Sequence, residues 1–193
     1  MHTRIHALLG WSPADPATRP DLLPAERLDT LGDLMAHHRG VTPAFRPRGF
    51  ETLSSADRAR IDGLIAAVLV LDGLMDARED RLAGRPLRLP VDELDELKIT
   101  DAHLLDARVD FALRRMAERY GQRIRKLMQG AAPLGRPWLG GWRYRLTIAR
   151  VEQLLRARQV DPALWFDPQK TPGLMDRPMA SARIAWRVLT GRG

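Results

Sequence analysis

Two pairs of aspartates, each pair one helical turn apart, are the residues in this sequence best suited to chemistry. Asp72 and Asp76 lie on one predicted helix, and Asp106 and Asp110 lie on another. Side chains four residues apart share a face of a helix, so each pair could present both carboxylates to one ion. Two such pairs facing each other could hold Mg²⁺ against a diphosphate. The spacing therefore supports one hypothesis, a Mg²⁺-dependent helical enzyme.

The same spacing has a purely structural interpretation. Asp72, Asp76 and Glu79 fall at the edge of the apolar stripe of one predicted helix, where they would face other helices. A charge that is removed from water needs a partner. The three carboxylates could therefore pair with arginines of the long helix that follows and fix how the two helices dock. The residues alone leave both interpretations open.

Other catalytic or metal-binding patterns are absent from the sequence. There is no cysteine, which excludes disulfides and thiolate metal sites. The five histidines are scattered, and no Glu-x-x-His motif occurs. No glycine-rich phosphate loop follows a strand pattern, and no serine nucleophile elbow is present. We therefore expect no cofactor, and a non-enzymatic protein is the favoured interpretation.

Basic residues are concentrated in the second half of the chain. The protein has 31 basic and 24 acidic residues, with a formal net charge of +7. Residues 1–99 hold 13 basic and 16 acidic side chains, whereas residues 100–193 hold 18 and 8. Most of the excess lies between residues 111 and 158, where 12 basic residues face only Glu118 and Glu152. One contiguous stretch of the chain is thus strongly cationic.

Aromatic residues are interleaved with these cations, and that combination pairs phosphate neutralisation with base stacking. It favours a small helical subunit that binds RNA or DNA without catalysis, within a larger nucleoprotein assembly. An adaptor that docks an acidic protein is the first alternative, and a solvated arginine-rich surface would need no ligand at all. The candidate nucleic-acid-binding residues are Arg108, Arg115, Arg119, Arg123, Lys126, Arg136, Trp138, Arg143, Arg145 and Arg150.

The elements that would position these residues are helices. Residues 54–84 read as a central helix, because the run from Leu64 to Leu71 is apolar on every side and must be surrounded. A second long helix is predicted over 100–129, antiparallel to the first, with Arg108, Arg115, Arg119 and Lys126 along one flank. Further helices are predicted over 24–38, 142–159 and 178–190, with a helical turn over 91–97.

The fold class predicted from this pattern is all-α, as a compact bundle of about five to six helices joined by Pro/Gly-rich connections. We expect one helical domain over residues 1–193, divided into a Pro-rich segment (1–23), a near-neutral to acidic half (24–98) and a basic half (100–193). No apolar run is long enough to span a bilayer. We therefore expect a cytoplasmic protein without a membrane partner.

Overall fold

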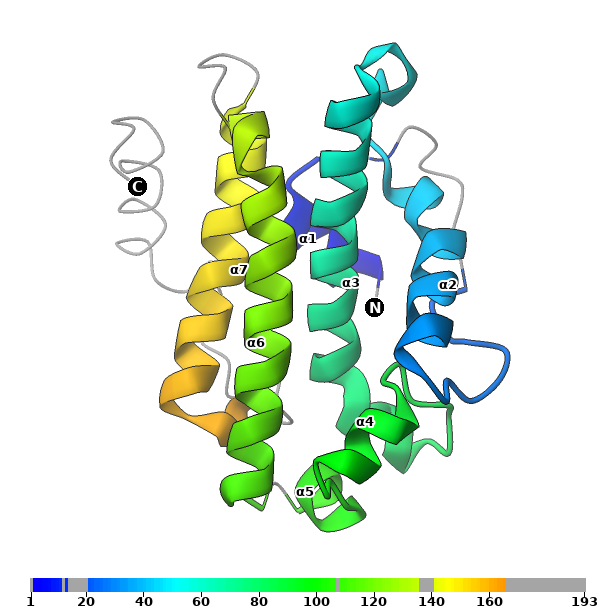
Figure 1. Ribbon diagram of the computed structural model, residues 1–193, viewed down its shortest axis with the longest axis vertical. Coiled ribbons are helices and arrows are strands. Elements are labelled where there is room, and N and C mark those ends of the chain that lie inside the picture. The colour runs from blue at the N-terminus through cyan, green and yellow to red at the C-terminus, as the bar shows by residue number, and fades with distance from the viewer. Residues whose placement is uncertain (1, 12, 14–20, 107, 136–140, 166–193) are drawn as a thin grey trace.

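One long helix, α3 (Ser55–Leu82), runs through the middle of the structure and touches most of the other elements. The computed structural model describes residues 2–11, 13, 21–106, 108–135 and 141–165 (Figure 1). These residues form seven α-helices and four short 3-10 helices, and they contain no strand, only an isolated bridge between Pro13 and Pro47. The predicted all-α fold class is confirmed.

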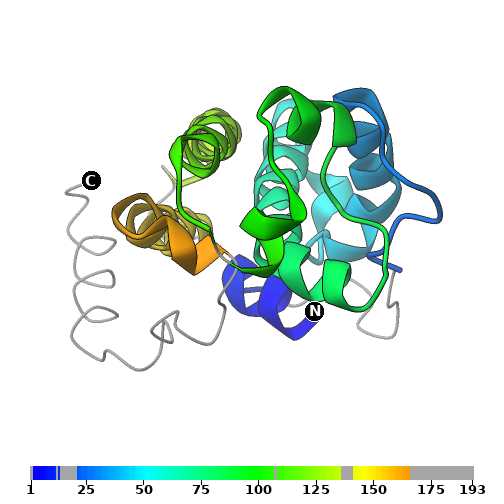
Figure 2. The same ribbon diagram turned by 90° about the horizontal axis from the view of Figure 1, so that it is seen from below.

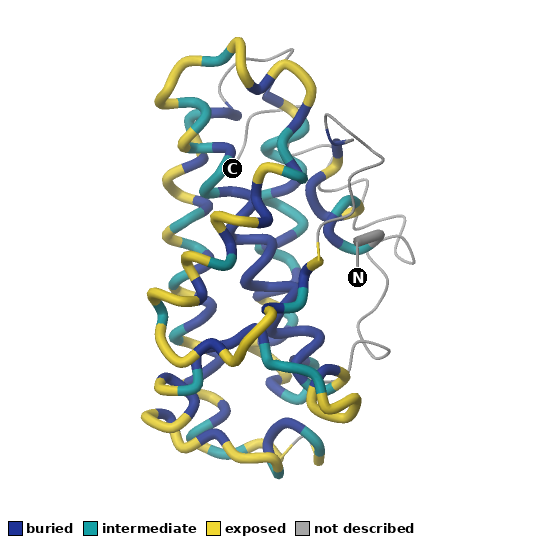
Figure 3. Tube along the Cα trace, turned by 90° about the vertical axis from the view of Figure 1, so that its right-hand side faces the viewer, coloured by how far each residue is buried: buried dark blue, intermediate teal, exposed yellow. Residues whose placement is uncertain are grey.

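The ends of α3 form as the sequence predicts. The Ser54 side chain accepts a hydrogen bond from the Asp57 amide and so caps the first turn. Gly84, at a φ of +65°, follows the last turn in the left-handed conformation that glycine adopts without strain. Between these ends every residue from 64 to 77 is buried, which gives the nearly continuous dark blue stretch in Figure 3. The apolar run is therefore surrounded, as expected.

Two further long helices complete the bundle. α6 (Phe111–Ala131) lies antiparallel to α3, and α7 (Trp142–Val160) runs antiparallel to α6 (Figure 1). Both α3 and α6 contribute buried apolar side chains to one core, which includes Leu71, Tyr120 and Ile124. The predicted pairing of the two central helices is thus present in the structure.

The predicted helix over 100–129 is wrong at its start. The chain forms a short helix, α5 (Asp101–Leu105), leaves the helical path, and begins again at α6. The break is stabilised by Asp110, whose side chain accepts hydrogen bonds from the amides of Ala112 and Leu113. Aspartate competes in this way for backbone amides and so favours a cap over a helix interior. Val109, which would fall on the apolar stripe of a continuous helix over 100–129, is consequently 40% exposed.

The predicted first helix over 24–38 is also displaced. The chain is non-helical up to Thr30, and α2 (Leu31–Val41) begins there through a capping box in which Thr30 and Asp33 bond each other's backbone amides. Two reciprocal cap bonds outweigh the preference of Pro24 for a helix start. The predicted end at residue 38 comes three residues early, because α2 continues to Val41 and passes into a 3-10 turn, η1 (Thr42–Phe45).

An N-terminal helix within the predicted Pro-rich segment was not expected. α1 (His2–Leu9) lies across the bundle between α3 and α7 (Figure 2). Its Ile5 and Leu9 side chains are fully buried, and the Thr147 hydroxyl of α7 donates a hydrogen bond of 2.6 Å to the Leu9 carbonyl. Helix α1 thereby joins the two long helices that flank it.

The remaining elements are short. The helical turn predicted over 91–97 is present as α4 (Val91–Glu96), and the predicted helix over 142–159 is present as α7. Three 3-10 segments lie in the connections, η2 (Phe50–Thr52), η3 (Ala132–Gly135) and η4 (Pro162–Trp165). The helix predicted over 178–190 lies outside the described residues. Among the helices that are described, none combines the length and apolarity that crossing a bilayer requires.

Two glycines of α3 provide a matched test of how closely the chain packs on this helix. A methyl group on Gly63 would meet nothing within 4 Å, whereas one on Gly73 would lie 3.1 Å from both Cβ and the carbonyl oxygen of Arg88. Replacing an interior helical glycine by alanine gains up to about 1 kcal/mol where there is room. We expect Gly63→Ala to raise the free energy of unfolding in urea and Gly73→Ala to lower it. Equal gains for both variants would contradict the close approach.

Because His38 is buried, we expect the folded protein to lose stability in acid. His38 of α2 is 4% exposed, and burial together with the nearby His37 and Arg88 lowers its pKa to about 3. In the unfolded chain the imidazole titrates near pH 6.5. The unfolded state therefore binds the proton first, and folding stability falls as the pH drops below about 6.5.

The expected loss from His38 is about 2 kcal/mol at pH 5. We expect His38→Met, which keeps the volume but cannot titrate, to show a shallower fall in melting temperature between neutral pH and pH 5 than the wild type. Superimposable pH profiles of the two proteins would show that His38 does not remain neutral in the folded state.

Candidate nucleic-acid interface

The buried face of α3 carries three carboxylates on successive turns. Asp72, Asp76 and Asp80 are each exposed by 1% or less. Arg88, from the connection after α3, is 4% exposed and lies among them. Its Nη1 donates to Asp72 at 2.7 Å, its Nη2 to Asp76 at 2.6 Å and its Nε to Asp80 at 3.2 Å. Each nitrogen of one guanidinium group thus meets a different carboxylate.

Two more arginines complete this buried cluster. Arg4 of α1 donates to the second oxygens of both Asp72, at 3.4 Å, and Asp76. Arg85 Nη2 lies 2.9 Å from the second oxygen of Asp80, an ion pair without hydrogen-bond alignment. Three carboxylates of α3 therefore face three guanidinium groups, one from α1 and two from the connection after α3. Burial and the neighbouring Asp76 raise the pKa of Asp72, against the opposing effect of Arg88.

This cluster corrects the structural interpretation made from the sequence. The third carboxylate is Asp80, on the same face as Asp72 and Asp76, whereas Glu79 is exposed. The spacing of four and eight residues was a usable signal for Asp80. The arginines come from α1 and the connection after α3, not from the long helix, and no pattern in the sequence marked Arg88 as their partner.

The predicted pairing of two aspartate motifs around Mg²⁺ does not form. Asp106 is exposed, and Asp110 caps α6 while its other oxygen lies 2.9 Å from His103 Nε2. The bond with His103 is the largest of the effects that lower the pKa of Asp110. Asp72 and Asp76 are occupied by guanidinium groups. Across the described residues, no group of three or more His, Asp or Glu side chains is arranged to hold a metal.

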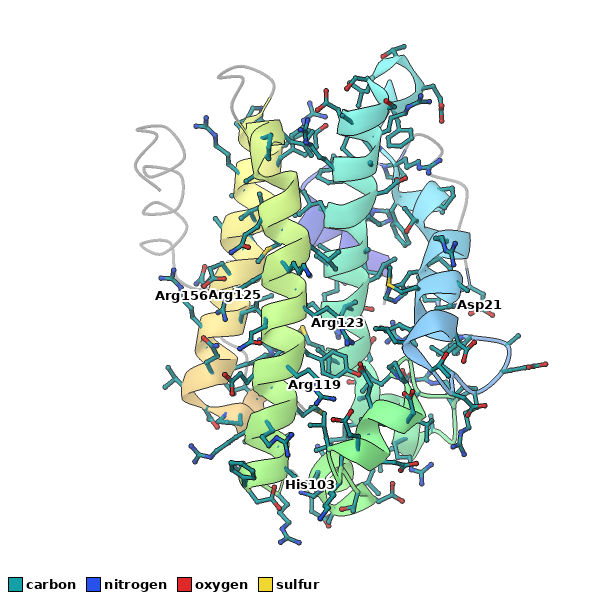
Figure 4. The ribbon with its side chains drawn as sticks, viewed as in Figure 1. Asp21, His103, Arg119, Arg123, Arg125 and Arg156 are labelled. Carbon is teal, nitrogen blue, oxygen red and sulfur yellow. The ribbon has the colours of Figure 1, made fainter. Side chains whose placement is uncertain are left out.

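Several of the candidate arginines are held by carboxylates within the fold. Figure 4 shows Arg119 and Arg123 leaving the same side of α6. Arg119 forms two bonds of 2.7 Å with Glu96, and Arg123 forms a two-pronged pair with Glu93, both acids belonging to α4. Burial would raise the pKa of Glu93, but the bonds from Arg123 bring it below the ordinary value. These two arginines attach α4 to α6.

The opposite flank of α6 is attached to α7 in the same way. Arg125 bonds Glu152 at 2.9 and 3.2 Å, and Arg156 bonds the same carboxylate at 2.8 Å (Figure 4). Both arginines lie outside the predicted site. Their charges are therefore partly offset by one shared glutamate.

Two other candidates bond backbone carbonyls. Arg145 donates to the Gly135 carbonyl, and Arg150 donates to the Ala7 carbonyl at 2.7 Å. Burial lowers the pKa of Arg150, which still carries its charge at neutral pH. A carbonyl has no formal charge, so the bond to Ala7 fixes the Arg150 side chain without cancelling its positive charge.

The remaining described candidates face solvent to different degrees. Arg108 is 63% exposed beside Asp110, at 3.3 Å, and precedes α6 instead of lying on its flank. Arg115 and Lys126 are exposed on α6, and Arg143 is half-buried at the start of α7. Arg136 and Trp138 lie outside the described residues. Of the eight candidates that the structure describes, Arg108, Arg115, Lys126 and Arg143 thus remain open to a ligand, whereas the other four are bonded to carboxylates or carbonyls within the fold.

Two exposed residues on α6 were missed by the sequence analysis. Arg114 is exposed next to Arg115. Phe111, the first residue of α6, is 73% exposed, and the Arg115 guanidinium lies 5.8 Å from the centre of its ring. The sequence did contain a sign that Phe111 is exposed, because this residue lies outside the apolar stripe of the helix predicted over 100–129. We define the α6 surface as Arg108, Phe111, Arg114, Arg115 and Lys126.

The charge around this surface is strongly positive. In the described parts of the segment 108–165, twelve basic side chains accompany four acidic ones. Glu93 and Glu96 of α4 add two negative charges, and both are occupied by α6 arginines. The region therefore keeps a net positive charge after the internal ion pairs are counted.

Comparison with known proteins adds no functional assignment. No protein-family model, curated protein or solved structure matches this chain.

The buried cluster predicts an unequal pair of substitutions. Arg88→Met removes the central guanidinium and leaves buried carboxylates short of a partner, a change that costs about 3–5 kcal/mol. Arg81 is 48% exposed and makes a two-pronged pair with Asp101, so Arg81→Met should cost no more than about 1 kcal/mol. Urea unfolding of the two variants measures the difference.

Thermal melting in the presence of Mg²⁺ distinguishes a structural role of the cluster from a metal site. Because guanidinium groups already occupy the carboxylates, added Mg²⁺ should leave the melting temperature of the wild type unchanged. Similar losses for Arg88→Met and Arg81→Met, or a rise in wild-type melting temperature with Mg²⁺, would contradict a structural role for the cluster.

Proposed function

We propose that this protein binds nucleic acid without catalysis, as a small helical subunit of a nucleoprotein assembly, and that the α6 surface contacts the phosphate backbone. The observation that carries the proposal is a positive region in which other arginines already occupy Glu93, Glu96 and Glu152, leaving Arg114, Arg115 and Lys126 exposed on one helix. A polyanion can neutralise these side chains without breaking an ion pair of the fold.

The α6 surface supplies four cations for such contacts, Arg108, Arg114, Arg115 and Lys126, and half-buried Arg143 at the start of α7 could supply a fifth. Phosphate contacts of this kind position a protein on nucleic acid but read no bases. The surface carries no helix-turn-helix or other groove-reading signature. Binding is therefore proposed to be largely independent of sequence and sensitive to salt.

An acidic protein partner is the alternative, and exposed Phe111 is the observation that favours it. Protein interfaces concentrate their affinity in a few aromatic and arginine side chains and depend less on salt. The two functions therefore differ in the slope of log affinity against log salt. Equal binding of an acidic protein at low and moderate salt, without retention of RNA or DNA, would favour the adaptor.

The proposal predicts a steep salt dependence. Each phosphate contact on a duplex contributes about −0.9 to the slope of log affinity against log salt, so five contacts predict about −4 to −5. Replacing Arg114, Arg115 and Lys126 together by Ala should flatten that slope by about 3 and weaken all sequences alike. Fluorescence anisotropy with labelled duplexes across a salt series measures both effects.

The matched control removes the same charge from another face. Arg27, Arg39 and Arg48 are exposed in α2 or in the segments that flank it in sequence. Helix α2 lies on the far side of α3 from α7 (Figure 1). Their triple replacement by Ala should change the slope far less. Equal effects of the two triple variants would mean that only net charge matters, and no salt-dependent retention at about 50 mM salt would reject the proposal.

A further inference from the structure

Phe111 is the least expected feature of the α6 surface. A phenylalanine side chain gains about 1.5–3 kcal/mol by burial, yet this ring is 73% exposed at the first position of α6. It does not belong to the apolar core, whose α6 members begin at Leu113. The Phe111 ring therefore adds little to the stability of the fold, and the faces of the ring are largely open to solvent.

The surroundings of the ring are cationic. Arg115, one turn further along α6, places its guanidinium 5.8 Å from the ring centre, within the range of a cation–π contact. Arg108 is 63% exposed three residues before Phe111, and exposed Arg114 follows three residues after it. An open aromatic ring is thus combined with three cations in one short segment.

This combination matches one class of ligand. A nucleobase stacks on an aromatic ring while arginines neutralise the adjoining phosphates, and every base offers such a face. Paired bases in a duplex are already stacked on each other, whereas unpaired bases are free to stack on protein side chains. A duplex would meet the arginines but leave Phe111 without a partner.

We infer that the ligand of the α6 surface is single-stranded nucleic acid and that Phe111 is the side chain on which a base stacks. This inference rests on the proposed function and adds the class of nucleic acid to it. Trp138, the stacking residue expected from the sequence, lies outside the described residues, whereas Phe111 is an exposed aromatic side chain in contact with an exposed arginine, Arg115.

The test compares a short labelled oligothymidylate with a labelled duplex at one salt concentration. Phe111→Ala should weaken binding of the single strand by about 5- to 150-fold, the range expected for one lost base stack, and leave duplex binding unchanged. Phe111→Trp should restore single-strand binding, because indole stacks on bases. Phe111→Leu should behave like Phe111→Ala, because leucine keeps apolar area without a π face.

Leu82→Ala provides the control for loss of an exposed apolar side chain, since Leu82 is 65% exposed at the end of α3. It should affect neither ligand. All variants are surface changes, and unchanged melting temperatures would show that the fold is retained.

The outcomes separate this inference from the proposed function. If wild-type protein binds neither ligand in a salt-dependent way, both fail. If it binds both but Phe111→Ala has no effect, or weakens them equally, stacking is rejected while backbone binding stands. Stacking is also rejected if Phe111→Leu retains full single-strand affinity, or if Phe111→Ala disperses a dimer seen by analytical ultracentrifugation, since the ring would then be a protein contact.

Discussion

The ion-pair cluster around Arg88 is the interaction on which the arrangement of this protein depends. Three aspartates on one face of α3 would be unstable in an apolar core without cations. Arg88 supplies one nitrogen to each, and Arg4 and Arg85 meet the remaining oxygens. Because an ion pair of this kind is costly to bury and far more costly to break, it fixes which segments lie on α3.

Several features of the fold follow from that constraint. Gly73 lies directly beneath Arg88, where a larger residue would hold the connecting segment away from the helix. Arg4 brings α1 to the same cluster, and the bonds from Thr147 and Arg150 to α1 carbonyls tie that helix to α7. The acidic half of the chain and the basic half are therefore joined through α1 as well as through the apolar contact between α3 and α6.

Arginine has three separate roles in this structure. Buried or half-buried arginines neutralise carboxylates and join helices, as Arg88, Arg123 and Arg125 do. Others, such as Arg150, bond carbonyls and keep their charge uncompensated. A third group, with Arg115, remains exposed. Only the last group can meet a ligand without cost to the fold, which is why the proposed surface is smaller than the cationic segment of the sequence.

The sequence by itself determined the fold class, because periodic apolar residues and cap signals such as Ser54 and Gly84 act locally along the chain. It also located the concentration of positive charge and two aspartates of the buried cluster. It did not determine the break before α6, where the Asp110 side chain outcompetes helix continuation. Only the tertiary structure decided which arginine meets which carboxylate and which aromatic rings are left exposed. Those outcomes depend on contacts between segments far apart in the chain, as between Arg4 and Asp76.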